Sequence, residues 1–488
     1  MSTKVLVVVA GAVTVVVGCL LLRNKKPRRN RKSQGKPIPQ IHQSMYEVIK
    51  GFASSYFPQF LYYLSRSNPS VAFLPLPLAQ DVILCSDPIA AKVVFEKCGK
   101  STLYSAIDPF LHGPNLFTHA SAKPPQRKEI LKGFDLRAVE RFREVSEDLF
   151  KKWIEEMKRG TEEQREFEPT PNLLSLILKT ICKGGFDYDI PDEDGAQLLE
   201  LFALISVEAK LQLYSPLRKL AASLGLISNH RRALEMATQA YKIVERMIAH
   251  YRAQGNEDSA PLMAAIDRCP VYTSDEERKR DIAVLLVAGH DTTAFQIAWC
   301  LNDLASHPEV QSELRQQILS CTPAGAAQEG QWGRDSPLLN FVVKESQRVH
   351  SVAVCLFREA KEGPVHLPSG QVIEKGSLIA IDLFSAMRNE TYYPNADEWR
   401  PERWSGTAEE TATANAAFIP FSTGARSCVG LTVALVQMRV FLGMLVRNFE
   451  IERTANPVLA HCITLEPHGL RIRLKPVFTE DTHTQATS

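Results

Sequence analysis

The chain has 488 residues, of which 45% are hydrophobic and 23% are charged. This average globular composition excludes wholesale disorder, collagen-like repeats and a polytopic membrane protein. The 57 basic and 55 acidic residues give a net charge of +2, but seven of the basic residues lie between Arg23 and Lys32, where there are no acids. Subtracting those seven from +2 leaves a body with a charge of −5, so nucleic acid is not expected as a partner.

The ten cysteines are scattered along the chain and form no C-x-x-C pair. This spacing argues against a zinc ribbon and against a disulfide scaffold, and it favours a reducing compartment.

An apolar run from Val5 to Leu22 opens the chain. Its eighteen residues would span roughly 27 Å as a helix, about the thickness of a bilayer core. The basic stretch that follows directly favours a cytosolic body under the positive-inside rule. A cleaved signal peptide is the alternative, because Val17-Gly18-Cys19 resembles a lipoprotein cleavage site. The expected organisation is a transmembrane anchor at 1–22, a basic, proline-containing linker at 23–44, a catalytic domain at 45–478 and a tail at 479–488.

Helical periodicity dominates the body, which has no repeats and no interdomain linker. Strand-like segments are few and lie near its two ends. The sequence therefore predicts one mainly α domain with minor β-sheets. The nucleotide and serine-hydrolase motifs G-x-G-x-x-G, G-x-x-x-x-G-K-[ST] and G-x-S-x-G are absent from the sequence. The expected helices cover roughly 135–160, 170–186, 196–224, 228–254, 276–305, 308–320 and 335–349, and strand-like pieces occur around 71–74, 81–85, 371–384, 449–452 and 469–474.

The segment from Asp281 to Leu301 is apolar on nearly every face, which predicts a helix through the core. Its midpoint is Gly289-His290-Asp291-Thr292-Thr293, and burying these polar groups is costly unless they are paired. The glycine and the β-branched residues also weaken the helix there, and such local distortion often marks function. A structural role for Asp291 and the threonines is the alternative. His290, without a second ligand at metal spacing, is more typical of a wall residue.

Glu345 and Arg348 lie three residues apart and can pair on one helical face. Arg403, in the later segment P-E-R-W, could complete a Glu-Arg-Arg network. The expected role of these three residues is structural.

Cys428 lies just before a long apolar segment that begins at Leu431. Free N–H groups and the helix dipole stabilise a thiolate at a helix N-terminus, which favours metal ligation or nucleophilic attack. Gly424 and Gly430 permit unusual backbone conformations and close approach of a flat ligand, and Arg426 could neutralise an acid on that ligand. A buried core cysteine is the alternative.

The segment F-S-T-G-A-R-S-C-V-G, residues 421–430, resembles the haem-binding loop of the cytochrome P-450 family. Three further segments resemble family motifs in the family's order. They are A-G-H-D-T-T at 288–293, E-S-Q-R at 345–348 and P-E-R-W at 401–404. A looser likeness extends over 81–475. The resemblance implies the helical haem-thiolate fold.

By this resemblance, Cys428 is the metal ligand that holds the iron of haem b, iron protoporphyrin IX. Arg426 and Arg358 would pair with its propionates, and Phe421 and Gly430 belong to the same cofactor-binding loop. Asp291 and Thr292 would be the catalytic residues that relay protons for oxygen activation.

The match departs from the family at one point. Arg127 in P-P-Q-R-K resembles the arginine of the family's Trp-x-x-x-Arg helix, but Lys123 occupies the tryptophan position and a proline pair follows it. A proline pair suits only a helix start, which weakens the assignment of Arg127 to a propionate. The segments that would line the substrate pocket, about 102–118, 196–224 and 352–357, match no substrate-specific signature.

The implied activity is insertion of one atom of dioxygen into a lipophilic small molecule. Sixty residues follow Cys428, too few for a flavin domain, so electrons are expected from an NADPH-dependent reductase. The expected location is the endoplasmic reticulum membrane, with a single-pass helix and a cytosolic catalytic domain. One alternative is a haem-thiolate isomerase or dehydratase that acts on hydroperoxides without a reductase. Such an enzyme would be expected to lack the Asp-Thr pair, so the intact pair Asp291-Thr292 counts against this alternative. Another is a non-enzymatic haem sensor or membrane scaffold.

Overall fold

The protein is described by a computed structural model. The expected anchor at 1–22 and tail at 479–488, most of the expected linker, and Lys123 lie outside the described residues. The described part comprises residues 36–477, apart from residues 42, 44–46, 49–50, 52–53, 55, 75–81, 122–123, 161–165, 215, 255 and 322–335.

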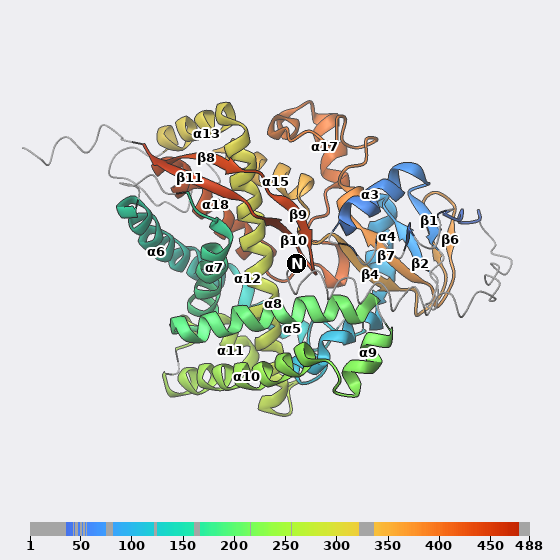
Figure 1. The fold of residues 1–488 in the computed structure, drawn as a ribbon, viewed down its shortest axis with the longest axis horizontal. Coiled ribbons are helices and arrows are strands. Elements are labelled where there is room, and N and C mark those ends of the chain that lie inside the picture. The colour runs from blue at the N-terminus through green and yellow to red at the C-terminus, as the bar shows by residue number, and fades with distance from the viewer. Residues whose placement is uncertain are drawn as a thin grey trace, which may run out of the picture.

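Four helices pack together in the fold, and α12, the longest of them, runs through the middle of the molecule (Figure 1). It packs against α7, α18 and α10, and α18 packs against α6. Helix α12 contains Ile282, Leu286 and Ile297, all fully buried, as expected for a helix that passes through the core. The bounds are α6 Leu136–Gly160, α7 Pro169–Phe186, α12 Asp275–Ser306 and α18 Leu431–Asn448.

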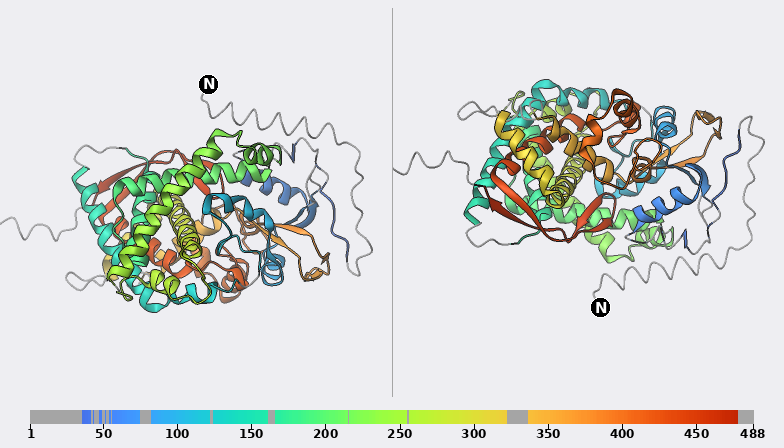
Figure 2. Two further views of the ribbon diagram at one scale, coloured as in Figure 1. Left: turned by 90° about the horizontal axis from the view of Figure 1, so that it is seen from below. Right: turned by 90° about the horizontal axis from the view of Figure 1, so that it is seen from above.

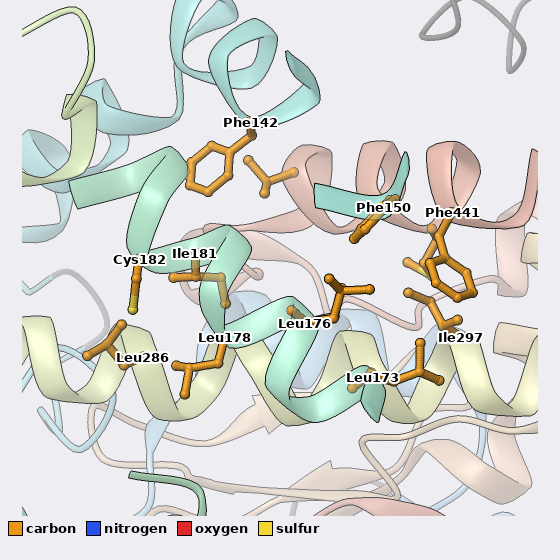
Figure 3. Packing of buried hydrophobic residues seen from close by; sticks show 14 of the residues in the cluster. Phe142, Phe150, Leu173, Leu176, Leu178, Ile181, Cys182, Leu286, Ile297 and Phe441 are labelled. Carbon is orange, nitrogen blue, oxygen red and sulfur yellow. The ribbon is translucent and has the colours of Figure 1, made fainter. Parts of the chain in front are cut away.

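Aromatic and branched side chains fill the space between these helices (Figure 3). Phe150 of α6 meets Phe441 of α18 edge-on, with ring centroids 5.3 Å apart, a favourable aromatic geometry. Gly289 of α12 lies so close to α7 that an added Cβ would be 2.9 Å from Cδ1 of Ile181. The glycine therefore permits close helix packing. Helix α12 continues through it without a break, so the expected distortion is not present in the secondary structure.

Helix α8 (Asp192–Tyr214) and α10 (Ser228–Gln254) pack on each other and lie across one side of the molecule (Figure 2). The expectation of one helix over 196–224 was wrong, because α8 ends at Tyr214 and a separate helix, α9, covers Pro216–Ser223. Pro216 explains this division. A proline lacks the N–H that would continue the helix, but its fixed φ suits a first turn.

The sheets are small, and the largest lies at the opposite end from α6 and α7, whereas β8 and β11 lie on the same side as α6 (Figure 1). The largest has the strand order β1-β2-β7-β4-β3, in which β2 and β7 are parallel and the other pairs are antiparallel. Three two-stranded sheets pair β5 with β6, β8 with β11 and β9 with β10. The strands are β1 Val71–Leu74, β2 Val82–Cys85, β3 Gly99–Lys100, β4 Cys355–Glu359, β5 Val365–His366, β6 Val372–Ile373, β7 Leu378–Asp382, β8 Phe449–Ala455, β9 Val458–His461, β10 Leu465–His468 and β11 Arg471–Pro476.

Shorter helices complete the mainly α fold with minor sheets that the sequence predicts. By length and composition, α12 and α18 could each cross a membrane, but both pack within the core. The expected N-terminal span lies outside the residues searched. The remaining helices are α3 Phe57–Ser67, α4 Pro88–Lys97, η1 Thr102–Leu111, α5 Arg127–Ile130, η2 Leu131–Phe134, α11 Pro261–Asp267, α13 Pro308–Cys321, α15 Pro337–Val349, α16 Leu383–Ala386, η5 Pro401–Ser405, α17 Ala408–Ala417 and η6 Gly424–Arg426.

Candidate active site

The loop before α18 is tightly folded around Cys428. The short helix η6 opens it, and the Cys428 N–H donates to the carbonyl of Phe421 at 3.0 Å. Gly424 has a φ of +72°, a left-handed conformation that favours glycine, and an added Cβ would lie 3.2 Å from the carbonyl oxygen of Phe95. Gly430, the N-cap of α18, has an ordinary φ of −91°. The backbone conformation therefore favours glycine at position 424 but not at position 430, and close approach of a flat ligand to Gly430 stays a prediction.

Cys428 is accessible and yet surrounded by protein. Its surface is exposed, whereas burial is the first cause that raises the pKa of its thiol. The sulfur is therefore accessible to solvent although protein atoms surround it on most sides. The backbone N–H of Gly430 and the charges of Arg127 and Lys100 oppose the rise but do not overcome it. Metal ligation would favour the deprotonated sulfur, and the thiolate at position 428 stays a prediction.

Four cationic side chains from separate segments gather beside this loop: Lys100, Arg127, Arg358 and Arg426. Burial and the three guanidinium groups hold the pKa of Lys100 well below its usual range. Burial, followed by Arg127 and Arg358, lowers the pKa of Arg426 to about 10. Among the described residues, none of the four forms an ion pair with a carboxylate. Like charges gathered in this way without an anion are mutually destabilising.

The guanidinium groups are fixed in place by backbone carbonyls. Arg426 donates to the carbonyls of Leu116 at 2.8 Å and Phe117 at 3.0 Å. Arg127, at the start of α5, donates to the carbonyl of Ser427 at 2.6 Å. Arg358, on β4, is almost fully buried, and its Nε has no hydrogen-bond partner. An unpaired buried donor within a cationic cluster fits an anionic ligand, and the two propionates of haem b have the required charge.

Helix α12 has an accessible face in the middle of its buried length. Ala288 is exposed, and Val287, Gly289, Asp291 and Thr292 are partly exposed between buried residues. The Thr292 hydroxyl donates to the carbonyl of Ala288 at 3.0 Å. Burial raises the pKa of Asp291, and the hydroxyl of Thr464 donates to its Oδ2 at 3.1 Å. The acid and the alcohol therefore sit on the open part of the core helix.

His290 has the environment of a wall residue. It is buried, its Nδ1 lies 2.9 Å from the carbonyl of Leu286, and its ring packs against Phe202. Burial lowers its pKa, which favours the neutral imidazole. In the described part of the chain, no three His, Cys, Asp or Glu side chains are grouped as a metal site.

Glu345 and Arg348 form a buried ion pair on α15, whose first turn is capped by Ser336. Two guanidinium nitrogens of Arg348 donate to the two carboxylate oxygens, at 3.0 and 2.8 Å. Arg403 donates to Oε1 of Glu345 at 3.0 Å, and the indole N–H of Trp404 donates to Oε2 at 3.0 Å. Arg348 also binds three backbone carbonyls of the 387–398 segment. The network joins α15 to η5.

Two residues of this region carried no recognisable sequence signal. Lys100 ends a short strand in an ordinary C-G-K-S segment, and only its packing beside three arginines distinguishes it. Thr464 lies 173 residues from the aspartate it contacts. Lys123, which occupies the family's tryptophan position, lies outside the described residues.

Comparison with known proteins identifies the class. The cytochrome P450 family model matches residues 37–466, and the chain belongs to that family. Among its relatives, cytochrome P450 4F4 of Rattus norvegicus is 25% identical over 91% of this chain and 87% of its own length. Cytochrome P450 4F2 of Homo sapiens is 24% identical over 92% and 89%. Leukotriene-B4 omega-hydroxylase 3 of Mus musculus is 24% identical over 86% and 83%. The chain is therefore an oxidoreductase of the monooxygenase type.

Proposed function

We propose that this enzyme inserts one atom of dioxygen into a lipophilic organic substrate, using haem b held by Cys428 and electrons from an NADPH-dependent reductase. The observation that carries the proposal is a cluster of cations beside the accessible Cys428 sulfur, in which Lys100, Arg358 and Arg426 are buried and Arg127 is half-buried. A cluster of four cations without a carboxylate partner in the described structure is complementary to a dianionic cofactor. Haem bound there would supply the iron that activates dioxygen.

The chain's own groups would hold and move protons next to that site. Thr292 keeps its Oγ1 on the open face of α12 through the bond to Ala288. Asp291, whose pKa burial raises, can carry a proton on its carboxylate and pass it on, while Thr464 fixes its Oδ2. This acid-alcohol pair favours a monooxygenase over an isomerase or dehydratase, because rearranging a hydroperoxide needs no proton delivery to dioxygen.

We also propose that the enzyme is anchored in the endoplasmic reticulum membrane with its catalytic domain in the cytosol. The N-terminal apolar run and its basic flank support this topology. Three leucines near α9 add a second apolar surface: Leu220, Leu224 and Leu226 are 56%, 65% and 72% exposed. Exposed leucines clustered in this way are typical of a contact with lipid or protein.

Two measurements on the purified full chain test the proposal. We expect the reduced protein with carbon monoxide to show the strongly red-shifted Soret band of thiolate ligation. We also expect NADPH consumption and oxygenated product to depend on added reductase and a lipophilic substrate. A haem-loaded protein without the red-shifted band would overturn the Cys428 assignment. Turnover of a hydroperoxide without reductase, with no oxygenation in its presence, would favour the isomerase alternative, and no turnover with either would favour a sensor or scaffold.

A further inference from the structure

Asp281, near the start of α12, is a buried carboxylate that the proposed function does not use. It is 1% exposed, and it accepts the backbone N–H of Leu116 at 2.6 Å on Oδ1 and the hydroxyl of Tyr272 on Oδ2. Burial raises the pKa of Asp281, whereas these two donors and the side chain of Gln126 oppose the rise. Leu116 lies 165 residues away along the chain. The carboxylate therefore ties a distant segment to the core helix.

The segment that Asp281 holds is a short turn, residues 115–118, which is also fixed from within. Oδ1 of Asn115 accepts the N–H groups of Phe117 and Thr118 at 3.0 and 3.2 Å. The N–H of Asn115 in turn donates to the hydroxyl of Thr118 at 3.2 Å. These bonds favour movement of the turn as one unit, so the bond from Leu116 to Asp281 sets the place of the whole turn relative to α12.

Two of the four cations beside Cys428 rest on this turn. The guanidinium of Arg426 donates to the carbonyls of Leu116 and Phe117 at 2.8 and 3.0 Å. The ammonium of Lys100 lies 3.3 Å from the centroid of the Phe117 ring, within the range of a cation–π interaction. A shift of the turn would therefore displace both the acceptors of Arg426 and the ring beneath Lys100.

A third cation adjoins the same carboxylate through α5. The buried side chain of Gln126 hydrogen-bonds to Asp281. Gln126 is the N-cap of α5 and directly precedes Arg127, whose guanidinium donates to the carbonyl of Ser427 at 2.6 Å. One carboxylate on the core helix thus contacts the supports of three of the four cations.

We propose that Asp281 positions the cations that receive the haem propionates, by holding the 115–118 turn and Gln126 in place. The inference rests on the proposed function. Asp281 is a positioning residue, because it acts through these supports rather than on the cofactor. An ionised carboxylate suits this role, since its two oxygens accept several donors at once, whereas an amide offers one oxygen and presents N–H groups at the other position.

Two measurements on the haem-loaded full chain test the proposal: the rate of haem transfer to an excess of a scavenger protein, and the reduction potential of the haem. Asp281→Asn sets an amide N–H group against the donors that meet the carboxylate. We expect haem transfer to become about tenfold faster or more, because charge-assisted bonds to the propionates weaken. We also expect a more negative potential, because nearby cations favour the reduced haem, which carries one less positive charge.

Tyr272→Phe is the matched control. It removes one donor from the same carboxylate and leaves the 115–118 turn bound, so it should change neither the transfer rate nor the potential. If Asp281→Asn does not fold, Asn115→Ala decides, because it loosens the same turn from within and leaves α12 untouched. We expect Asn115→Ala to speed haem transfer and to shift the potential in the same direction as Asp281→Asn.

Three outcomes would overturn the proposal. They are a wild-type transfer rate in Asp281→Asn or in Asn115→Ala, an equal acceleration in Tyr272→Phe and Asp281→Asn, and a faster transfer with an unmoved potential. The last two would indicate general destabilisation of the fold. Any of these results with an intact red-shifted carbon monoxide band would leave the proposed monooxygenase function standing. Absence of that band from the haem-loaded wild type would instead count against the proposed function.

Discussion

Thr464 donates its hydroxyl to Oδ2 of Asp291 at 3.1 Å, which links the residue before β10 to the open face of the core helix. Because this bond lowers the pKa of Asp291, whereas burial raises it, removing the hydroxyl should raise that pKa further. We expect Thr464→Val to move the alkaline limb of coupled turnover, where Asp291 loses its proton, to higher pH and to reduce product per NADPH, and Thr464→Ser to restore both. An unmoved limb in the valine variant would contradict a positioning role for Thr464.

The second prediction concerns the alcohol on α12. Thr292→Ala removes the hydroxyl that is bound to the Ala288 carbonyl. Positioned proton transfer contributes on the order of a hundredfold or more. We expect product per NADPH to fall by about tenfold or more, with hydrogen peroxide released in its place. The ratio of peroxide to product measures this change, and Thr292→Ser, which keeps a hydroxyl, is the control. Unchanged coupling in the alanine variant would remove the proton-relay assignment.

The thiolate ligand itself is tested by Cys428→Ser. An alcohol is a poor substitute for a thiolate, so we expect the red-shifted carbon monoxide band to disappear while the far-ultraviolet circular dichroism stays unchanged. Cys462→Ser, at a cysteine in the turn that joins β9 to β10, is the matched control and should keep the band. A red-shifted band in Cys428→Ser would place the ligand elsewhere.

Replacing Lys100 should have opposite effects on the stability of the haem-free protein and on the retention of haem by the haem-bound protein. Without an anion the cluster is repulsive, so Lys100→Met should raise the Tm of the haem-free protein. If Lys100 holds a propionate as proposed, the same change would remove a charge-assisted hydrogen bond from the haem-bound protein, worth about 1.5–3 kcal/mol. Transfer of haem to an excess of a scavenger protein should therefore be tenfold or more faster. Lys97→Met, at an exposed position on α4, should alter neither quantity. If the Lys100→Met variant also altered neither quantity, propionate binding by Lys100 would be contradicted.

The Glu345 network should matter for folding more than for chemistry. Glu345→Gln leaves Arg348 and Arg403 without their carboxylate, and breaking a buried pair in this way costs about 3–5 kcal/mol. We expect a large fall in thermal stability or in soluble yield, with little change in turnover per bound haem. Asp148→Asn breaks an exposed pair with Lys152, with side chains 62% and 69% exposed, and should cost under about 1 kcal/mol. A stable Glu345→Gln enzyme with slow turnover would contradict the structural role.

The local hydrophobic pattern of the sequence was sufficient to predict most of the long helices in the body of the chain. The periodicity over 276–305 and 335–349 reflects burial along single helices, and the structure places α12 and α15 there. The division between α8 and α9 was missed even though Pro216 was visible, because the apolar pattern continues across the proline. The short helices α3 and α4 were also missed. The anchor at 1–22 stays a prediction.

The sequence by itself determined which residues carry the chemistry. Cys428, Thr292 and Glu345 each lie in a contiguous motif, because a loop before a helix, or a pair on one helical face, is set by neighbours a few residues away. The tertiary structure alone decided what surrounds them. It brings Lys100 to Arg426, Thr464 to Asp291, and Leu116 to Asp281. Contacts across one hundred residues or more depend on the packing of whole helices and strands, and no local spacing encodes that packing.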